Sequence, residues 1–264
     1  MTRIILVASG KGGVGKTTMA ANLATALTNM GSNVVVVDAN FSTGNLGHHF
    51  GLETPTYTLH DVLQGRAVID QAVYYHPSGV KFVPMGARIE DIEKKARKDF
   101  SRAIIDLVGR VDIIILDGAA GISSELKKAM IIANEMILVT NPEIPAIIEA
   151  LKTHKISESK GIKTLGVLVN KTKGKNYETS IQNIQEFTEL PILGAVSEDD
   201  DFSKHLQEKI PFLMAKPNSK SSKEINMIAA KIIGKNYDYK NITLGYRIRK
   251  FLGIWKNQSS KKNS

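Results

Sequence analysis

A glycine-rich stretch near the start of the chain limits the possible folds more than any other feature of the sequence. Residues 10–18 read GKGGVGKTT, and the apolar segment Ile4–Ala8 stands just before them. The stretch satisfies the pattern G-x-x-x-x-G-K-[ST], in which glycines let successive backbone N–H groups converge on a phosphate at the start of a helix. The sequence therefore predicts a strand, a phosphate-binding loop and a helix, in that order.

The polar residues of this loop are of the types that hold a nucleoside triphosphate. Lys16 is expected to reach the β- and γ-phosphates, and the hydroxyl of Thr17 is expected to ligate Mg²⁺. The glycines and the start of the helix provide N–H groups and a positive dipole end for the same anion. The residues predicted to contact ATP are Lys11, Gly12, Gly13, Val14, Gly15, Lys16, Thr17 and Thr18.

Strand-length apolar runs alternate with helix-period segments along most of the chain. Several runs are continuous, which is typical of parallel strands buried on both faces. After the loop, Ala20, Leu23, Ala24 and Leu27 share one helical face, and Gly31 stands where a C-cap glycine belongs. We expect a single α/β domain over residues 1–234, with a mostly parallel twisted sheet of about seven or eight strands and helices on both faces. The expected strands are Ile4–Ala8, Val34–Val37, Lys81–Pro84, Ile113–Leu116, Met136–Val139, Leu165–Val169 and Ile192–Val196.

Two acidic residues stand at the carboxyl ends of expected strands. Asp38 follows four valines, and Asp117 follows an apolar run and precedes the glycine-containing stretch GAAG. An acid at the end of a buried strand is costly unless it serves a cation. We therefore expect Asp38 and Asp117, together with Thr17, to hold Mg²⁺ or its bound water. A structural Asp117 that caps the next helix is the alternative.

Composition excludes several other kinds of site. The 264 residues contain no cysteine, which excludes disulfides, thiolate metal ligands and cysteine nucleophiles. The adjacent residues His48 and His49 face different directions on any regular element, so we expect no metal site there. The sequence shows neither a signal peptide nor an apolar run of spanning length, and we expect a cytoplasmic protein.

The net charge of +9 is concentrated in the last 30 residues or so. Of the 35 basic and 26 acidic residues, eight basic and one acidic lie from Lys235 onward, so residues 235–264 carry +7 and the remainder +2. We predict a basic tail that contains an amphipathic helix over about residues 242–256, a pattern typical of peripheral binding to an anionic membrane. A final helix docked on its own domain is the alternative. The residues expected at the membrane are Leu244, Arg247, Ile248, Lys250, Phe251, Leu252 and Trp255.

The segment KGGVGKTT, which begins at Lys11, resembles the deviant Walker A motif of the MinD/ParA family of ATPases, and the division-site members of that family are the most similar group. The two strand-end acids and the segments VTNP and VNK follow in family order, so the resemblance covers residues 1 to about 233. It implies a homodimer formed on ATP, in which Lys11 reaches the partner's phosphates, and an adenine contact from Asn170. It also implies slow ATP hydrolysis stimulated by a protein activator, whose identity the sequence does not give.

The sequence departs from the family pattern at Asn40. Most members have aspartate at this position, where it orients the attacking water, so we assign Asn40 to catalysis together with Lys11 and Lys16. Asparagine can hydrogen-bond a water but cannot take its proton. The departure leaves an ATP-binding scaffold with little turnover as an alternative to a slow hydrolase.

The resemblance implies spatial regulation, such as division-site placement, from the cytoplasmic face of the membrane. ATPases of the same family that partition DNA or place flagella are the alternatives. A DNA-partition ATPase would use surface lysines to bind the duplex, and the nearly neutral body disfavours DNA as the partner. A tyrosine kinase with this loop is a further alternative, which Tyr237, Tyr239 and Tyr246 support only weakly.

Overall fold

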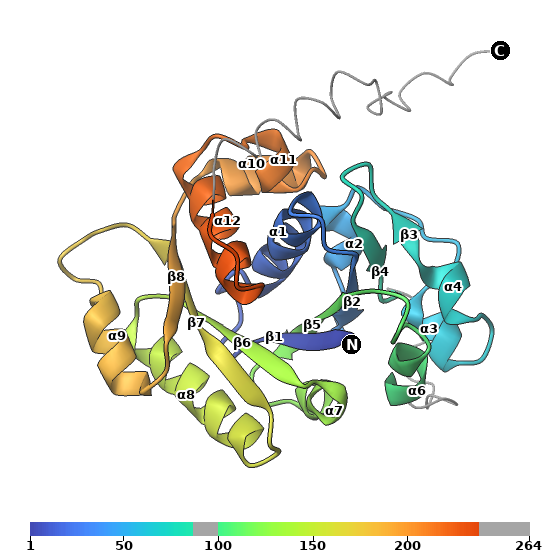
Figure 1. Cartoon of the computed structure of the whole chain (residues 1–264), viewed down its shortest axis with the longest axis horizontal. Helices are drawn as coiled ribbons and strands as arrows, with labels where there is room; N and C mark the ends of the chain where they lie inside the picture. Colours follow the sequence, from blue (N-terminus) through green and yellow to red (C-terminus); the bar gives the residue numbers. More distant parts are fainter. Residues whose placement is uncertain (87–99, 238–264) are drawn as a thin grey trace.

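The computed structural model of the chain describes residues 1–86 and 100–237. Within these ranges eight strands form one sheet in the order β3-β4-β2-β5-β1-β6-β7-β8 (Figure 1). Strand β3 runs antiparallel to β4, and every other neighbouring pair is parallel. The strands are β1 (Arg3–Ser9), β2 (Val34–Ala39), β3 (Tyr74–Tyr75), β4 (Lys81–Val83), β5 (Ile113–Ala120), β6 (Glu135–Thr140), β7 (Lys163–Thr172) and β8 (Ile192–Ser197).

The seven strands predicted from apolar runs are all confirmed. The prediction of a single, mostly parallel sheet is confirmed as well. The prediction omitted β3, a two-residue strand at the edge of the sheet that pairs with β4 through Tyr74 and Tyr75. So short a strand leaves no period in the sequence, because two residues cannot show an alternation.

Helices cover both faces of the sheet, as Figure 1 shows. Helices α1, α2, α11 and α12 contribute to the apolar cluster on one face, and α3, α4, α6, α7, α8 and α9 to the cluster on the other. The helices are α1 (Lys16–Asn29), α2 (Leu46–His49), α3 (Leu59–Leu63), α4 (Ile69–Ala72), α6 (Phe100–Ile105), α7 (Ser124–Ile132), α8 (Ile144–Glu158), α9 (Ile181–Thr188), α10 (Asp201–Gln207), α11 (Phe212–Ala215) and α12 (Lys220–Ile232).

Helix α1 is buried around most of its circumference and not only on the predicted face. Asn22 and Thr25 are as buried as Leu23, because α11 and α12 pack against the side that faces away from the sheet. The side-chain amide of Asn22 accepts a hydrogen bond from the backbone N–H of Leu213 in α11 at 2.9 Å. Gly31 follows the helix at a φ of 94°, which confirms the predicted C-terminal glycine.

Parallel pairing brings the polar strand ends to one edge of the sheet. Strands β2 and β5 are neighbours, and their register pairs Asp38 with Asp117. Strand β1 pairs with the other side of β5 and leads directly into the glycine-rich loop and α1. The loop and both acids therefore meet at the carboxyl edge of the sheet, where α/β proteins place their ligands.

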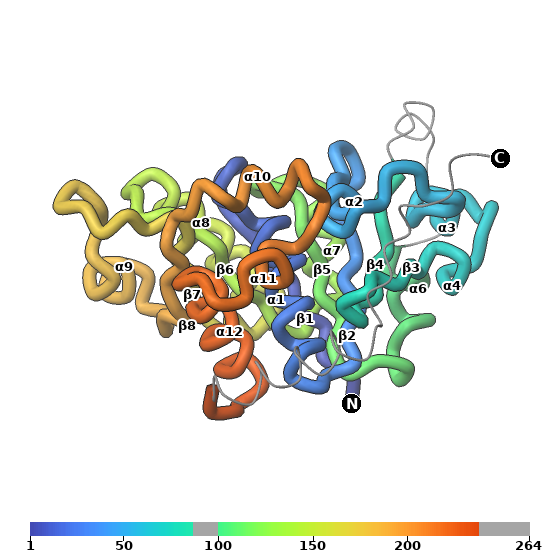
Figure 2. Tube along the Cα trace, turned by 90° about the horizontal axis from the view of Figure 1, so that it is seen from above, coloured from blue at the N-terminus to red at the C-terminus, as the bar shows by residue number. Residues whose placement is uncertain are grey.

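The described chain ends beside the opposite end of α1. Helix α12 lies along α1, as Figure 2 shows from above, and Nζ of Lys235 donates to the backbone oxygen of Met30 at 3.2 Å. In residues 1–86 and 100–237, none of the helices combines the length and the apolar character that a bilayer crossing requires. The predicted amphipathic helix over about residues 242–256, with all its proposed membrane contacts, lies outside the described residues, so the 235–264 tail stays a prediction.

Candidate nucleotide site

The glycine-rich loop turns from β1 into α1 through two glycines in the left-handed region. Gly13 has a φ of 78° and Gly15 a φ of 87°, a conformation that costs other residues free energy because of their Cβ atoms. A Cβ atom on Gly15 would also stand 2.3 Å from Nδ2 of Asn170. The loop therefore requires glycine at position 15 for two reasons, its backbone conformation and its contact with the end of β7.

The end of β7 holds the loop from behind. Nδ2 of Asn170 donates to the backbone oxygen of Val14 at 2.8 Å, and Nζ of Lys171 donates to that of Gly13, also at 2.8 Å. Lys171 itself has a φ of 60°, so the chain leaves the strand through a left-handed residue that turns this lysine toward the loop. Two carbonyl groups of the loop thus have hydrogen-bond partners on β7.

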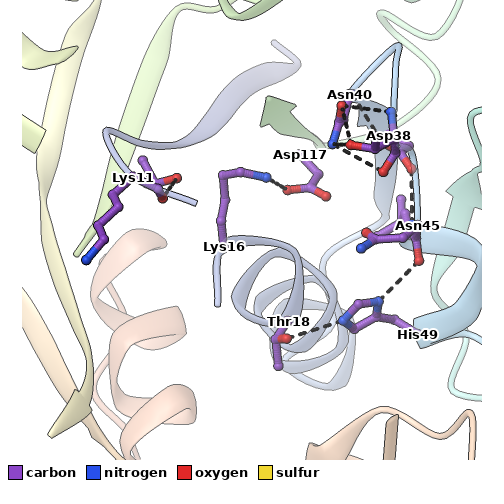
Figure 3. Close-up of polar contacts among 11 residues, drawn as sticks. Lys11, Lys16, Thr18, Asp38, Asn40, Asn45, His49 and Asp117 are labelled. Atoms are coloured by element: carbon purple, nitrogen blue, oxygen red, sulfur yellow. Dashed lines mark hydrogen bonds and ion pairs between the residues drawn. The ribbon is translucent and has the colours of Figure 1, made fainter. Parts of the chain in front are cut away.

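Lys16, the first residue of α1, forms a buried ion pair with the strand-end acid. Its Nζ lies 2.7 Å from Oδ1 of Asp117, and the two side chains are 8% and 1% exposed (Figure 3). The second carboxylate oxygen, Oδ2 of Asp117, is buried and has no hydrogen-bond partner within the described chain. A buried carboxylate oxygen without a donor is costly, and a cation or a cation-bound water would satisfy it.

Asp38 lies beside this pair and is fully buried. Its Oδ1 accepts from the N–H of Asn40 at 3.1 Å, and its Oδ2 accepts from the N–H of Leu46 at 3.0 Å. Burial, and after it the negative charge of Asp117, raises the pKa of Asp38 to about 7. The two neighbouring carboxylates repel each other, and a bound divalent cation would reduce this repulsion.

The geometry therefore fits the group that the sequence predicts. Thr17 supplies a hydroxyl at the start of α1, Asp38 and Asp117 supply carboxylates, and the loop supplies N–H groups for an anion. Among the described residues no three His, Asp or Glu side chains gather into a metal site on their own. A cation here would therefore draw most of its ligands from phosphate oxygens and water, as Mg²⁺ does.

The side chain of Asn40 is turned back on its own loop. Its Nδ2 donates to the backbone oxygen of Thr43 at 3.3 Å and contacts Oγ1 of Thr43 at 3.0 Å. Asn40 also lines the pocket described below, so its amide borders the predicted phosphate position while its hydrogen bonds go to Thr43. The role of Asn40 in orienting the attacking water stays a prediction.

Lys11 points away from the buried pair, as Figure 3 shows. Its Nζ lies 3.5 Å from Oε2 of Glu143, just before α8, and the two side chains are 51% and 57% exposed. An ion pair so exposed contributes little to stability. Lys11 is therefore free to exchange this glutamate for another anion.

A pocket of about 440 Å³ joins these residues along the carboxyl edge. Asp38, Asp117 and Val14 are buried and are not among its lining residues, whereas the other predicted contacts line it. The predicted residues that line it are Lys11, Gly12, Gly13, Gly15, Lys16, Thr17, Thr18, Asn40 and Asn170.

The sequence prediction missed some residues of this pocket, and the buried His49 is one of them. Its Nε2 lies 3.2 Å from Oγ1 of Thr18, and its Nδ1 lies 3.3 Å from the backbone oxygen of Asn45. Because a carbonyl oxygen only accepts, Nδ1 carries the hydrogen and Nε2 accepts from the Thr18 hydroxyl. Burial lowers the pKa of His49, which agrees with a neutral ring. His49 thus connects α2 to α1 through its hydrogen bond with Thr18.

Comparison with known proteins identifies the class. Residues 5–212 match the family described as the CobQ/CobB/MinD/ParA nucleotide binding domain. The chain therefore belongs to this family of P-loop ATPases, and its relatives and structural neighbours include proteins named MinD.

An uncharacterised ATP-binding protein of Methanocaldococcus jannaschii is 37% identical over 238 residues, which cover 90% of each chain. The crystal structure of the cell division ATPase MinD of Pyrococcus furiosus superposes with a TM-score of 0.85 at 33% identity and covers 89% of this chain and 99% of that one. The septum site-determining protein MinD of Pyrococcus horikoshii, solved with Mg-ADP, gives a TM-score of 0.84 at 33% identity over 88% of this chain and 96% of that one.

Proposed function

We propose that this chain is a MinD-like ATPase that binds Mg·ATP at the carboxyl edge of its sheet, dimerises on ATP and hydrolyses it slowly. The observation that carries the proposal is the convergence of Lys16, Asp38 and Asp117 beneath a loop with glycines at positions 13 and 15. Lys16 would leave Asp117 for the β- and γ-phosphates. Thr17 would ligate Mg²⁺, and Asp38 and Asp117 would hold its water shell. The bound ion would supply charge neutralisation at the phosphates.

Dimerisation would use Lys11, whose ion-pair partner within the described part of the chain is the exposed Glu143. A second cation brought to the γ-phosphate by a partner subunit makes the closed dimer depend on ATP rather than ADP. Lys11→Ala should then spare nucleotide binding by the monomer and remove ATP-dependent dimerisation. Loss of monomer binding in this variant would contradict the trans role.

Membrane attachment would use the predicted helix over residues 242–256. Its four basic residues contribute about 1 kcal/mol each at an anionic surface. Partial burial of five apolar side chains adds about 1–2 kcal/mol each. Ordering of about 13 residues opposes this by about 1 kcal/mol or more per residue. One tail is therefore marginal, whereas two tails on a dimer gain effective concentration, so ATP binding would become attachment to the cytoplasmic face of the membrane.

The test is sedimentation of the full chain with anionic liposomes and, separately, with duplex DNA, each with ATP, ADP or no nucleotide. The proposal expects pelleting with liposomes in ATP alone, and its loss on deletion of residues 242–264. Trp255→Ser should weaken pelleting, while Ser259→Ala in the polar end, which leaves the charge of the tail unchanged, should change it little. Binding to DNA without liposomes would favour a partition ATPase and overturn the membrane role.

A low rate of hydrolysis is part of the proposal, because Asn40 offers no base and is hydrogen-bonded to Thr43. The cellular role we propose is spatial regulation such as division-site placement, with a protein activator that accelerates turnover. An activator that raises phosphate release only in the presence of liposomes would support this role.

A further inference from the structure

Glu125 connects two segments of the site that lie far apart in the sequence. It lies in the first turn of α7, and its Oε2 accepts from the backbone N–H of Phe41 at 3.1 Å. Its Oε1 accepts from the hydroxyl of Ser42. Phe41 and Ser42 belong to the loop that follows β2, so one carboxylate holds that loop by two donors.

The contact extends beyond the carboxylate. Nζ of Lys128, one turn along α7, lies 5.4 Å from the centre of the Phe41 ring, and the ring of Phe100 meets that of Phe41 edge-on at 5.2 Å. Glu125 thus holds the backbone of Phe41 while Lys128 and Phe100 hold its ring. Three kinds of interaction at one residue show that the loop has a built docking site on α6 and α7.

The two connected segments are those that follow the two site carboxylates. Asp38 is the last residue but one of β2, which the loop of residues 40–45 follows. Asp117 lies in β5, after which residues 121–123 lead into α7. The loop is already tied at both ends to Asp38, through the N–H groups of Asn40 and Leu46. Glu125 adds hydrogen bonds in the middle of the loop. These bonds connect the loop to α7, which follows Asp117 in the chain.

We infer that Glu125 is a positioning residue that couples the loop carrying Asn40 to the segment following Asp117, so that both respond together when a γ-phosphate is present. The inference rests on the proposed function, because it concerns the same site. Its physical basis is that two loops joined by a charge-assisted hydrogen bond cannot shift independently without breaking that bond. Without Glu125, the loop of residues 40–45 would keep only its ties to Asp38 and the ring contacts of Phe41.

The test compares Glu125→Ala, which removes both acceptors, with Glu125→Asp, which keeps the charge on a shorter side chain. Ser42→Ala removes one donor and leaves the carboxylate. Glu158→Ala, at the exposed end of α8, is the matched control, since the side chain of Glu158 forms an exposed ion pair with Lys155 far from the loop of residues 40–45 in the sequence. The measurements are the affinities for fluorescent ADP and ATP analogues with Mg²⁺, dimerisation in ATP by sedimentation, and hydrogen exchange of residues 40–46.

We expect Glu125→Ala to change ADP affinity by less than about twofold and to weaken ATP-driven dimerisation by about tenfold, the size expected for loss of a charge-assisted hydrogen bond. Exchange of residues 40–46 should rise in the variant with ATP bound, while ATP should still protect residues 118–123. Ser42→Ala should show a smaller effect of the same kind, and Glu125→Asp should recover part of the loss. A residue with a merely structural role would lower ADP and ATP affinity equally and would lower the melting temperature.

Two negative results have different meanings. If the wild-type chain binds neither ADP nor ATP, the proposed function fails, and the inference fails with it. If the wild-type chain binds ATP and dimerises, and Glu125→Ala does both to the same extent as Glu158→Ala, only the coupling by Glu125 is overturned.

Discussion

Nζ of Lys16 lies 2.7 Å from Oδ1 of Asp117, and both side chains are almost wholly buried. The lysine begins the helix after β1, and the aspartate lies in β5, the neighbour of β1 in the sheet. The contact therefore joins the cation that we propose for the phosphates to the anion that we propose for the magnesium shell. In the chain without nucleotide each charge neutralises the other, and Mg·ATP would have to take over both partners.

Removal of either charge of this pair should destabilise the chain without nucleotide. Lys16→Met and Asp117→Asn should each lower the free energy of unfolding by about 3 kcal/mol, because each removes the ion-pair partner of a buried charged group. The double variant should lose less than the sum of the two by at least about 2 kcal/mol, since it leaves neither member of the pair without its partner. Urea unfolding without nucleotide measures the free energy of unfolding of the wild-type chain, the two single variants and the double variant. Additive losses would contradict the coupling of the two residues.

Asn40→Asp should accelerate ATP hydrolysis by about tenfold or more, because a carboxylate at this position can take a proton from water and an amide cannot. Phosphate release at saturating Mg·ATP measures the rate. Asn40→Ala is the control, since it too removes the hydrogen bonds that Nδ2 of Asn40 donates to Thr43 but adds no base. Equal acceleration in both variants would mean that release of the loop, and not a base, limits the rate.

Gly15→Ala and Gly31→Ala separate backbone conformation from loop contact. Both glycines have positive φ values, 87° and 94°, so both substitutions should cost about 1–2 kcal/mol of stability. A Cβ atom at position 31 meets no atom within 4 Å, whereas one at position 15 meets the amide of Asn170 at 2.3 Å. Gly15→Ala should therefore also abolish nucleotide binding, measured by titration with a fluorescent ADP analogue. Retained affinity in that variant would show that the loop tolerates the displacement.

His76 should make the stability of the chain depend on pH on the acid side. Burial lowers the pKa of His76 to about 4, and its Nδ1 accepts from the N–H of Ser78, which requires an unprotonated nitrogen. Because the folded pKa lies below the unfolded value, the full contribution is present above about pH 6.5 and is lost as the pH falls toward 4, by up to about 3 kcal/mol.

Urea unfolding at several pH values between 4 and 8 checks this dependence. His76→Asn keeps an acceptor near the position of Nδ1 and does not titrate, so its stability should fall less over the same range. An identical pH profile in the variant and the wild-type chain would assign the acid sensitivity to other groups.

The sequence was sufficient to predict the sheet and the position of the loop, because continuous apolar runs and the glycine pattern are local signals. It also predicted that Asp38 and Asp117 lie together, since parallel strands end at the same edge of the sheet. Their pairing in the register of β2 and β5 confirms this.

Contacts between distant segments had no such signal. Lys171 reaches the backbone oxygen of Gly13, a residue 158 positions away, only because β7 ends behind the loop in a left-handed residue. The bond between His49 and Thr18 depends on how α2 packs against α1, and the docking of Phe41 depends on α7. Side-chain direction in loops follows from tertiary packing, which residue types alone do not encode.

Helix α1 begins at the phosphate loop and ends at Met30, whose backbone oxygen receives the side chain of Lys235. A helix of 14 residues is about 21 Å long. The phosphate loop and Lys235, near the end of the described chain, therefore lie at opposite ends of α1. The described chain thus ends near one tip of α1, and the pocket lies at the other tip, on the carboxyl edge of the sheet.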